Sequence, residues 1–386
     1  MRLCRAGFFA AVLFAVAAAD SAARADTFVY RDREGARHEV DARLAGSGQR
    51  THALELSDGQ ILLVPEAAVI ERRPADDPEP INHLAMEKKL LEAFPADKLL
   101  TAIERPLVLA MVLARPVDQP RERAQRVAML RQLGKSFGNV QGKFQEFIRA
   151  TRVPTRGLRF PLVVLIFEAD QDFNDYAAAI IGGDSLSARN VAGFYSALSN
   201  HLVLRLSECD TFQVPMHEFI HMQVHNRGVF ERLAPVPVWF HEGIATSFEG
   251  ERGQVRRVPT NITERYANLA AQSRTVTWKQ IVEEDRPFRG DLFAGEAYGN
   301  AWGMHWLLLT QYKVRYGQYV RRLAEKTALE EYSAADRLKD FEEVFEKSPD
   351  ELQREFLDRI ARAGIRVSAT DLPPSPHPPR AAGRPA

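Results

Sequence analysis

The segment His217-Glu218-Phe219-Ile220-His221 constrains the fold of this chain more than any other. On an α-helix, residues four apart lie on one face, one turn above the other, so the spacing places two imidazoles side by side. Two such imidazoles can bind one Zn²⁺ at about 2.0–2.1 Å each. Glu218 is rotated about 100° from His217, beside the ion and not bound to it. The pattern therefore predicts a helix that carries two metal ligands and a neighbouring carboxylate.

Signals at both ends agree with this helix. Pro215 suits a first turn, and Asn226-Arg227-Gly228 is typical of a helix end. The motif alone is not decisive, because the ten histidines of the chain make a chance match expected in roughly two such chains per hundred. The alternative is a helix with two surface histidines and an unrelated glutamate. A third ligand decides between them, since a catalytic zinc site keeps three protein ligands and one open position.

Glu242 is the best candidate for that ligand. The metzincin pattern would need a histidine at 227, where this chain has Arg227. His225 lies one further turn along the helix, which is too straight for three turns to converge easily on one ion. Glu242 follows His221 by 21 residues, an interval that accommodates a loop and a second helix opened by Pro237. Two His and one Glu form a known catalytic zinc set.

The H-E-x-x-H motif, followed by Trp239-Phe240-His241-Glu242-Gly243-Ile244-Ala245, resembles the gluzincin metallopeptidases. The resemblance is closest to their peptidase MA-like members of undescribed substrate. It covers roughly residues 82–365 and is strongest at 211–249. It implies that His217, His221 and Glu242 bind Zn²⁺, and that Glu218 is the general base and acid.

The resemblance also implies a substrate site. In this family a strand beside the zinc helix forms the edge on which an extended peptide lies, and Leu202 to Leu206 would be that strand. Edge pairing binds the peptide backbone with little dependence on sequence. Such enzymes often direct a Tyr or His at the developing oxyanion. Tyr298 is the candidate, against a plain core tyrosine, with His305 in reserve, while His241 points away from Glu242.

The remaining chain predicts an α+β protein, in which a small all-β module precedes a thermolysin-like catalytic domain. That domain would hold a small mixed sheet with an edge strand, then a helical zinc-binding and C-terminal part. Short β-prone runs separated by turn sequences indicate the module. It is either an adaptor for cell wall or partner, or an appendage packed on the main domain.

In the rest of the chain, buried strands are expected at 107–113, 162–167 and 201–206, a helix at 121–150, and almost only helices after 211. The predicted boundaries are 1–25 for a signal peptide, 26–73 for the module, 74–81 for a Pro-rich linker, 82–366 for the catalytic domain and 367–386 for a disordered tail.

Residues 1–25 have the form of a secretory signal. Arg2 and Arg5 precede an apolar run from Ala6 to Ala19, which at 14 residues is short for a membrane span of about 20. Ala23 and Ala25 are the small residues that a signal peptidase reads. The alternative is a retained anchor. We therefore expect a periplasmic or extracellular bacterial protein whose mature chain has no membrane span.

The composition of the chain argues against two classes of function. The 51 basic and 51 acidic residues balance, which argues against a nucleic-acid partner, since such proteins usually show a basic excess. Removal of the signal leaves Cys209 as the only cysteine, and no Cys-His signature surrounds it, so we expect a small buried residue.

These inferences predict an exported zinc-dependent peptidase, in which a zinc-bound water activated by Glu218 attacks an extended peptide or protein substrate. One alternative is a non-enzymatic surface or envelope binding protein with a gluzincin-like fold. Another is a zinc amidase acting on cell-wall peptide. All four residues of the catalytic set are present, so the usual sign of a degenerate binding protein, a lost His or Glu, is missing.

Overall fold

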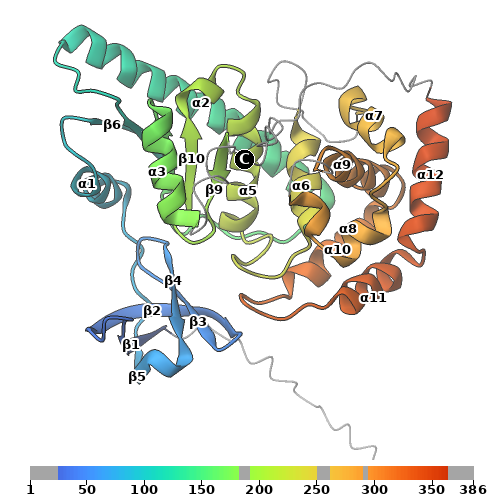
Figure 1. Ribbon diagram of the computed structural model, residues 1–386, viewed down its shortest axis with the longest axis horizontal. Coiled ribbons are helices and arrows are strands. Elements are labelled where there is room, and N and C mark those ends of the chain that lie inside the picture. Colours follow the sequence, from blue (N-terminus) through green and yellow to red (C-terminus); the bar gives the residue numbers. More distant parts are fainter. Residues whose placement is uncertain (1–24, 182–191, 250–260, 290–293, 364–386) are drawn as a thin grey trace, which may run out of the picture.

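The computed structural model describes residues 25–181, 192–249, 261–289 and 294–363. The expected tail and, apart from Ala25, the expected signal peptide lie outside these ranges. Figure 1 shows a separate β module, a mixed sheet flanked by helices, and a helical C-terminal part. Within the described ranges, no helix combines the length and the apolar character needed to cross a membrane. The predicted mixed α+β class, with an N-terminal all-β region and a helical C-terminal part, is confirmed.

The N-terminal module is a five-stranded antiparallel sheet in the order β4-β3-β2-β1-β5. Phe28, Leu54 and Val64 form its buried core. The short β-prone runs predicted from the sequence overlap the first four strands, and a fifth strand ends at Ala75, two residues into the segment predicted as linker. Pro74 is tolerated there because β5 is an edge strand, where a missing N–H costs no ladder bond on the open side. The strands are β1 (Ala25–Arg31), β2 (Arg37–Gly48), β3 (Thr51–Glu55), β4 (Ile61–Pro65) and β5 (Val69–Ala75), with the 3₁₀ turn η1 (Glu66–Ala68) before β5.

The second sheet has the order β6-β7-β8-β10-β9. Its three inner strands are parallel, and both outer strands run antiparallel to their neighbours. The prediction that Leu202–Leu206 forms the edge is wrong, because the chain enters β10 through a hairpin that folds β9 against its outer side. All five residues of β10 are buried, as an inner strand requires. The strands are β6 (Leu99–Glu104), β7 (Leu107–Val112), β8 (Leu162–Phe167), β9 (Gly193–Tyr195) and β10 (His201–Arg205).

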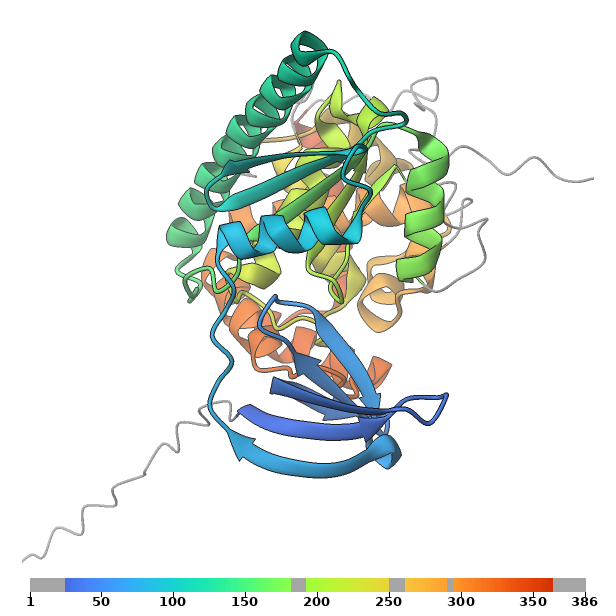
Figure 2. The same ribbon diagram turned by 90° about the vertical axis from the view of Figure 1, so that its left-hand side faces the viewer.

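Helices cover both faces of this sheet. On one side α1 (His83–Ala93) and α3 (Asp170–Ile181) pack against it, and on the other α2 (Pro120–Thr151) and α5 (Gln213–Asn226) (Figure 2). Successive side chains of a strand point to opposite faces, so a strand between two helical layers must be apolar at every position. In β7, Val108 faces α1 and Leu109 faces α2. The predicted apolar strands are thus explained by burial on both sides.

The C-terminal helices surround the long helix α9, which lies against α6 and α7. Gly243, directly after Glu242, is required by this packing: a Cβ there would lie 2.0 Å from Cδ2 of His305. A Cβ at Gly299 would lie 2.7 Å from the backbone N of Ala270. The two glycines therefore let α9 approach both neighbours closely. The helices are α6 (Val238–Phe248), α7 (Glu264–Gln272), α8 (Trp278–Glu283), α9 (Ala294–Gln311), α10 (Lys313–Ala324), α11 (Ala334–Phe345) and α12 (Pro349–Arg362), with the 3₁₀ turns η2 (Leu206–Cys209) and η4 (Arg286–Phe288).

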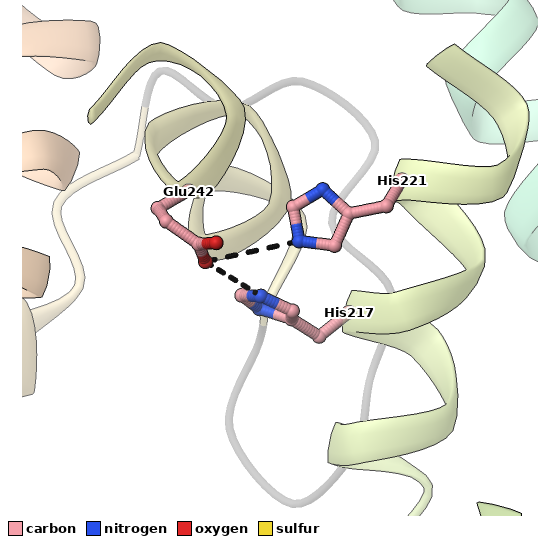
Figure 3. A group of neighbouring side chains, drawn as sticks. All are labelled: His217, His221 and Glu242. Atoms are coloured by element: carbon pink, nitrogen blue, oxygen red, sulfur yellow. Dashed lines mark hydrogen bonds and ion pairs between the residues drawn. The ribbon is translucent and has the colours of Figure 1, made fainter. Parts of the chain in front are cut away.

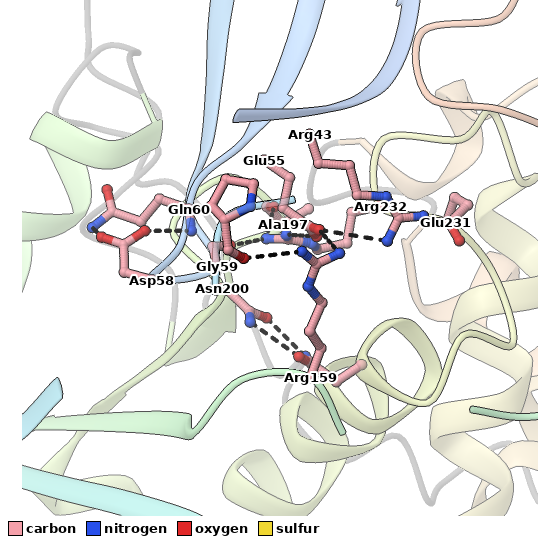
Figure 4. A network of polar contacts seen from close by, with 12 residues as sticks. Arg43, Glu55, Asp58, Gly59, Gln60, Arg159, Ala197, Asn200, Glu231 and Arg232 are labelled. Atoms are coloured by element: carbon pink, nitrogen blue, oxygen red, sulfur yellow. Dashed lines mark hydrogen bonds and ion pairs between the residues drawn. The ribbon is translucent and has the colours of Figure 1, made fainter. Parts of the chain in front are cut away.

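Buried polar contacts join the β module to the rest of the protein (Figure 4). Arg232 is central: one guanidinium nitrogen lies 2.8 Å from the carboxylate of Glu55 in β3, and another donates to the carbonyl of Ala197 at 3.1 Å. The backbone N–H of Ile61 donates to the carbonyl of Leu198 at 2.7 Å. The module is therefore packed on the main domain, and some of its contacts reach the turn that connects β9 to β10.

Candidate metal centre

Two helices bring the predicted ligands together (Figure 3). Helix α5 contains both histidines and stops before Gly228, which takes the left-handed conformation with φ of 66°. The imidazoles of His217 and His221 lie on one face with ring centroids 4.9 Å apart. Helix α6 begins after Pro237, as predicted, and directs Glu242 at both rings.

The distances fit a tetrahedral metal site. One carboxylate oxygen of Glu242 lies 3.0 Å from Nε2 of His217 and 3.7 Å from Nε2 of His221. All three ligand atoms lie within 4.8 Å of one another. A tetrahedral Zn²⁺ with bonds of about 2.0–2.1 Å sets its ligand atoms about 3.3 Å apart. Because the observed distances lie on either side of this value, the three side chains could bind one zinc ion with small rotations.

The charges of the site also favour a cation. Burial opposes protonation of His217, but the carboxylates of Glu242 and Glu249 outweigh it and raise the His217 pKa well above its usual range. Burial likewise raises the pKa of Glu242, yet the imidazoles of His221 and His217 reverse this and lower it well below its usual range. Buried carboxylates around two imidazoles thus need positive charge, which protons or a divalent ion can supply.

The sequence reasoning missed two residues that hold His217. Glu249, the residue at the C-terminal end of α6, lies 2.8 Å from Nδ1 of His217, and its other oxygen accepts a hydrogen bond of 2.7 Å from the hydroxyl of Tyr266. An Nδ1–H donated to Glu249 leaves the Nε2 lone pair facing Glu242, where a metal would bind. Its position seven residues after Glu242 is a signal that could have found Glu249. Tyr266 comes from α7, and no local spacing indicates it.

We predict that Glu249→Gln weakens zinc binding about 10–100-fold, because the amide cannot orient and polarise His217 as a carboxylate does. Competition with a chromogenic chelator measures the affinity. Glu264→Gln, at an exposed position of α7, is the control and should bind zinc as the wild type does. Equal affinities for the two variants would contradict the role assigned to Glu249.

Glu218 is held beside the three candidate ligands. Its carboxylate accepts a hydrogen bond of 3.0 Å from the backbone N–H of Tyr195 in β9. Burial raises the pKa of Glu218, and the imidazoles of His221 and His217 counter this in part. A raised pKa suits a group that must take up a proton and give it back near neutral pH. The edge strand is thus connected directly to the predicted general base.

A cavity of about 130 Å³ opens next to His217 and Glu218. Tyr298 lines it, and its ring centroid lies 6.4 Å from that of His217. Burial and the nearby carboxylates of Glu242 and Glu218 raise the Tyr298 pKa well above its usual range, so the hydroxyl keeps its proton and can donate. The lining residues are Ala192, Gly193, Gln213, Val214, His217, Glu218, Glu249, Arg265, Tyr266, Leu269, Ala294, Gly295 and Tyr298.

His305, the reserve for Tyr298, does not line this cavity. It is fully buried in the aromatic core, with its ring centroid 4.6 Å from that of Phe240 and its Nδ1 3.4 Å from the hydroxyl of Tyr316. Burial lowers its pKa to about 3. His305 therefore acts as a core residue under Gly243, and the structure places Tyr298, not His305, beside the ligands.

The other singled-out residues are structural. His225 stacks on Tyr195 at 5.7 Å and lies 5.1 Å from His241, both measured between ring centroids. Neither His225 nor His241 belongs to the described group of converging ligand atoms. Cys209 is buried, as predicted, and burial raises its pKa to about 12, which keeps it a thiol.

The fold and the site define a mixed α+β protein with a candidate His-His-Glu metal centre. A family model described as "Protein of unknown function (DUF1570)" matches residues 213–330. This range contains His217, Glu218, His221, Glu242 and Tyr298, and covers less than half of the chain. No curated protein matches the chain.

Proposed function

We propose that this protein is an exported, zinc-dependent peptidase of the gluzincin type. The observation that supports it most is the convergence of His217, His221 and Glu242 on one point, with Glu218 held beside them at a cavity. A structural zinc site would be closed by a fourth protein ligand, whereas three ligands next to an open space are typical of catalytic zinc.

The mechanism assigns one task to each residue. Zinc, when bound by His217, His221 and Glu242, would polarise the peptide carbonyl and lower the pKa of a water molecule. Glu218 takes a proton from the attacking water and passes it to the leaving amine, as its raised pKa allows. The backbone N–H of Tyr195 keeps the Glu218 carboxylate oriented between the two transfers.

Tyr298 and strand β9 supply the substrate contacts in this proposal. The Tyr298 hydroxyl is the donor for the oxyanion that forms at the carbonyl, and its proximity to Glu242 supports this role. Gly193 in β9 lines the cavity, and the outer side of β9 pairs with no described strand. An extended peptide could add to that side through backbone hydrogen bonds, so that its chain passes Glu218.

Metal analysis and metal removal test the proposal. The purified mature protein should contain one zinc per chain and cleave a broad peptide mixture, with the new termini read by mass spectrometry. Dialysis against a chelator should abolish cleavage, and zinc but not magnesium should restore it, because Mg²⁺ prefers octahedral oxygen ligands. Zinc without cleavage would favour the non-enzymatic binding protein. Cleavage of cell-wall peptide alone would favour the amidase, and absence of zinc would refute the ligand assignment.

A further inference from the structure

One wall of the cavity is formed by helix α7. Arg265, Tyr266 and Leu269 line it, at helix positions i, i+1 and i+4, which lie on neighbouring parts of one face. Tyr266 is fixed through its hydrogen bond to Glu249, and Leu269 packs against Gly299 of α9. Arg265 therefore lines the same space as His217 and Glu218, next to two residues of α7 that are held by contacts with other elements.

Arg265 has no carboxylate partner in the described part of the protein. Its Nε is buried and makes no hydrogen bond, and no described carboxylate forms an ion pair with its guanidinium. The guanidinium carbon lies 5.3 Å from the centre of the Tyr266 ring. Elsewhere the structure pairs such groups: buried Arg232 binds Glu55 at 2.8 Å. A partly buried cation without a counter-charge is unfavourable, so this position favours the arrival of an anion.

The acidic residues of the cavity do not supply that anion. Glu249 is bound to His217 and Tyr266, and Glu218 is held by the N–H of Tyr195. Both carboxylates are thus directed toward the metal centre and its supports. Among the described residues that line the cavity, no other carboxylate is present, so the position of Arg265 suits an anion carried by a molecule that enters the cavity.

We propose that Arg265 binds a carboxylate of the substrate, which makes the preferred substrates peptides with a carboxylate close to the cleaved bond. This inference rests on the proposed peptidase function. A guanidinium offers two parallel N–H donors that match the two oxygens of a carboxylate, and the Tyr266 ring beneath it limits its rotation. The carboxylate belongs either to an acidic side chain or to the C-terminus of the peptide, and both present the same chemistry.

The test compares wild type, Arg265→Met and a control, Arg286→Met, on one peptide mixture. Arg286 is exposed and lies outside the cavity. In the wild type, we expect Asp, Glu or the free C-terminus within two residues of the cleaved bond. This should occur at least about tenfold more often than chance, because a hydrogen bond to a charged group stabilises binding by about that factor. Arg265→Met should lose the enrichment and keep its zinc, and Arg286→Met should match the wild type. Amidated peptides, and peptides with Gln for Glu, separate the C-terminal from the side-chain carboxylate.

Binding measurements keep the inference testable apart from catalysis. Titration calorimetry with an acetylated, amidated peptide that contains one Glu, and with its Gln counterpart, should show at least about tenfold preference for Glu in the wild type and none in Arg265→Met. For the C-terminal source, the same comparison uses a free-acid peptide and its amide. Equal binding of both members in both pairs would overturn the inference. Cleavage without carboxylate preference would also overturn it while leaving the peptidase function intact, whereas a preference in binding without cleavage would support Arg265 and refute the peptidase.

Discussion

Glu218→Gln is expected to lower kcat for peptide cleavage by about 10²–10⁴-fold while leaving one zinc ion bound, because general acid–base catalysis contributes that much. Glutamine has the shape of glutamate, and its amide oxygen can still accept the hydrogen bond from the N–H of Tyr195. It cannot take up the proton of the attacking water. The ligands His217, His221 and Glu242 are unchanged, so metal content and catalysis should separate in this variant.

The comparison requires zinc analysis and initial-rate measurements on the same preparation. Glu264→Gln, with the same chemical change at an exposed position of α7, is the matched control and should cleave at the wild-type rate. If Glu218→Gln kept full zinc and full activity, another group would have to be the general base. If it lost zinc, Glu218 would be supporting the ligands and not the proton transfers.

The convergence of His217, His221 and Glu242 could be predicted from the sequence because helix geometry translates spacing into position. Residues 217 and 221 must share a face if the segment is helical, and Pro237 indicated where the second helix begins. The contacts that orient His217, made by Glu249 and Tyr266, could not be predicted in the same way. Tyr266 reaches Glu249 only because α7 packs beside α9, and that packing depends on Gly299. Contacts between distant segments follow from tertiary structure, which no local pattern encodes.

The edge of the second sheet is another feature that local sequence patterns could not predict. The apolar run 201–206 was predicted as a strand, and burial on both faces explains its composition. Which strand lies at the edge depends on whether β9 folds back on β10, and β9 has only three residues. Helix α1 was not predicted either, although Asn82 caps it by accepting hydrogen bonds from the N–H groups of Leu84 and Ala85. A polar cap just after a proline-rich segment was the available signal.

Glu242→Ala is the second change for which we expect a large effect, a loss of zinc affinity of more than about 100-fold. Substitution of a residue that only orients a ligand, such as Glu249, is expected to lower zinc affinity about 10–100-fold, and removal of a ligand atom should lower it further. The variant also leaves His217 and His221 without the carboxylate that faces both. Chelator competition gives the affinity, and a thermal melt with and without zinc gives a second measure, because a ligand that binds only the folded state raises Tm.

The order of the three glutamate variants separates this assignment from its competitors. Zinc affinity should fall most for Glu242→Ala, less for Glu249→Gln and not at all for Glu218→Gln, since these side chains bind the metal, orient a ligand and move a proton, respectively. Zinc should raise the Tm of Glu218→Gln and leave that of Glu242→Ala unchanged at the same concentration. If Glu242→Ala bound zinc as tightly as the wild type, the third ligand would lie elsewhere. His225, one turn beyond His221 on α5, would then be the residue to substitute next, although its ring now stacks on Tyr195.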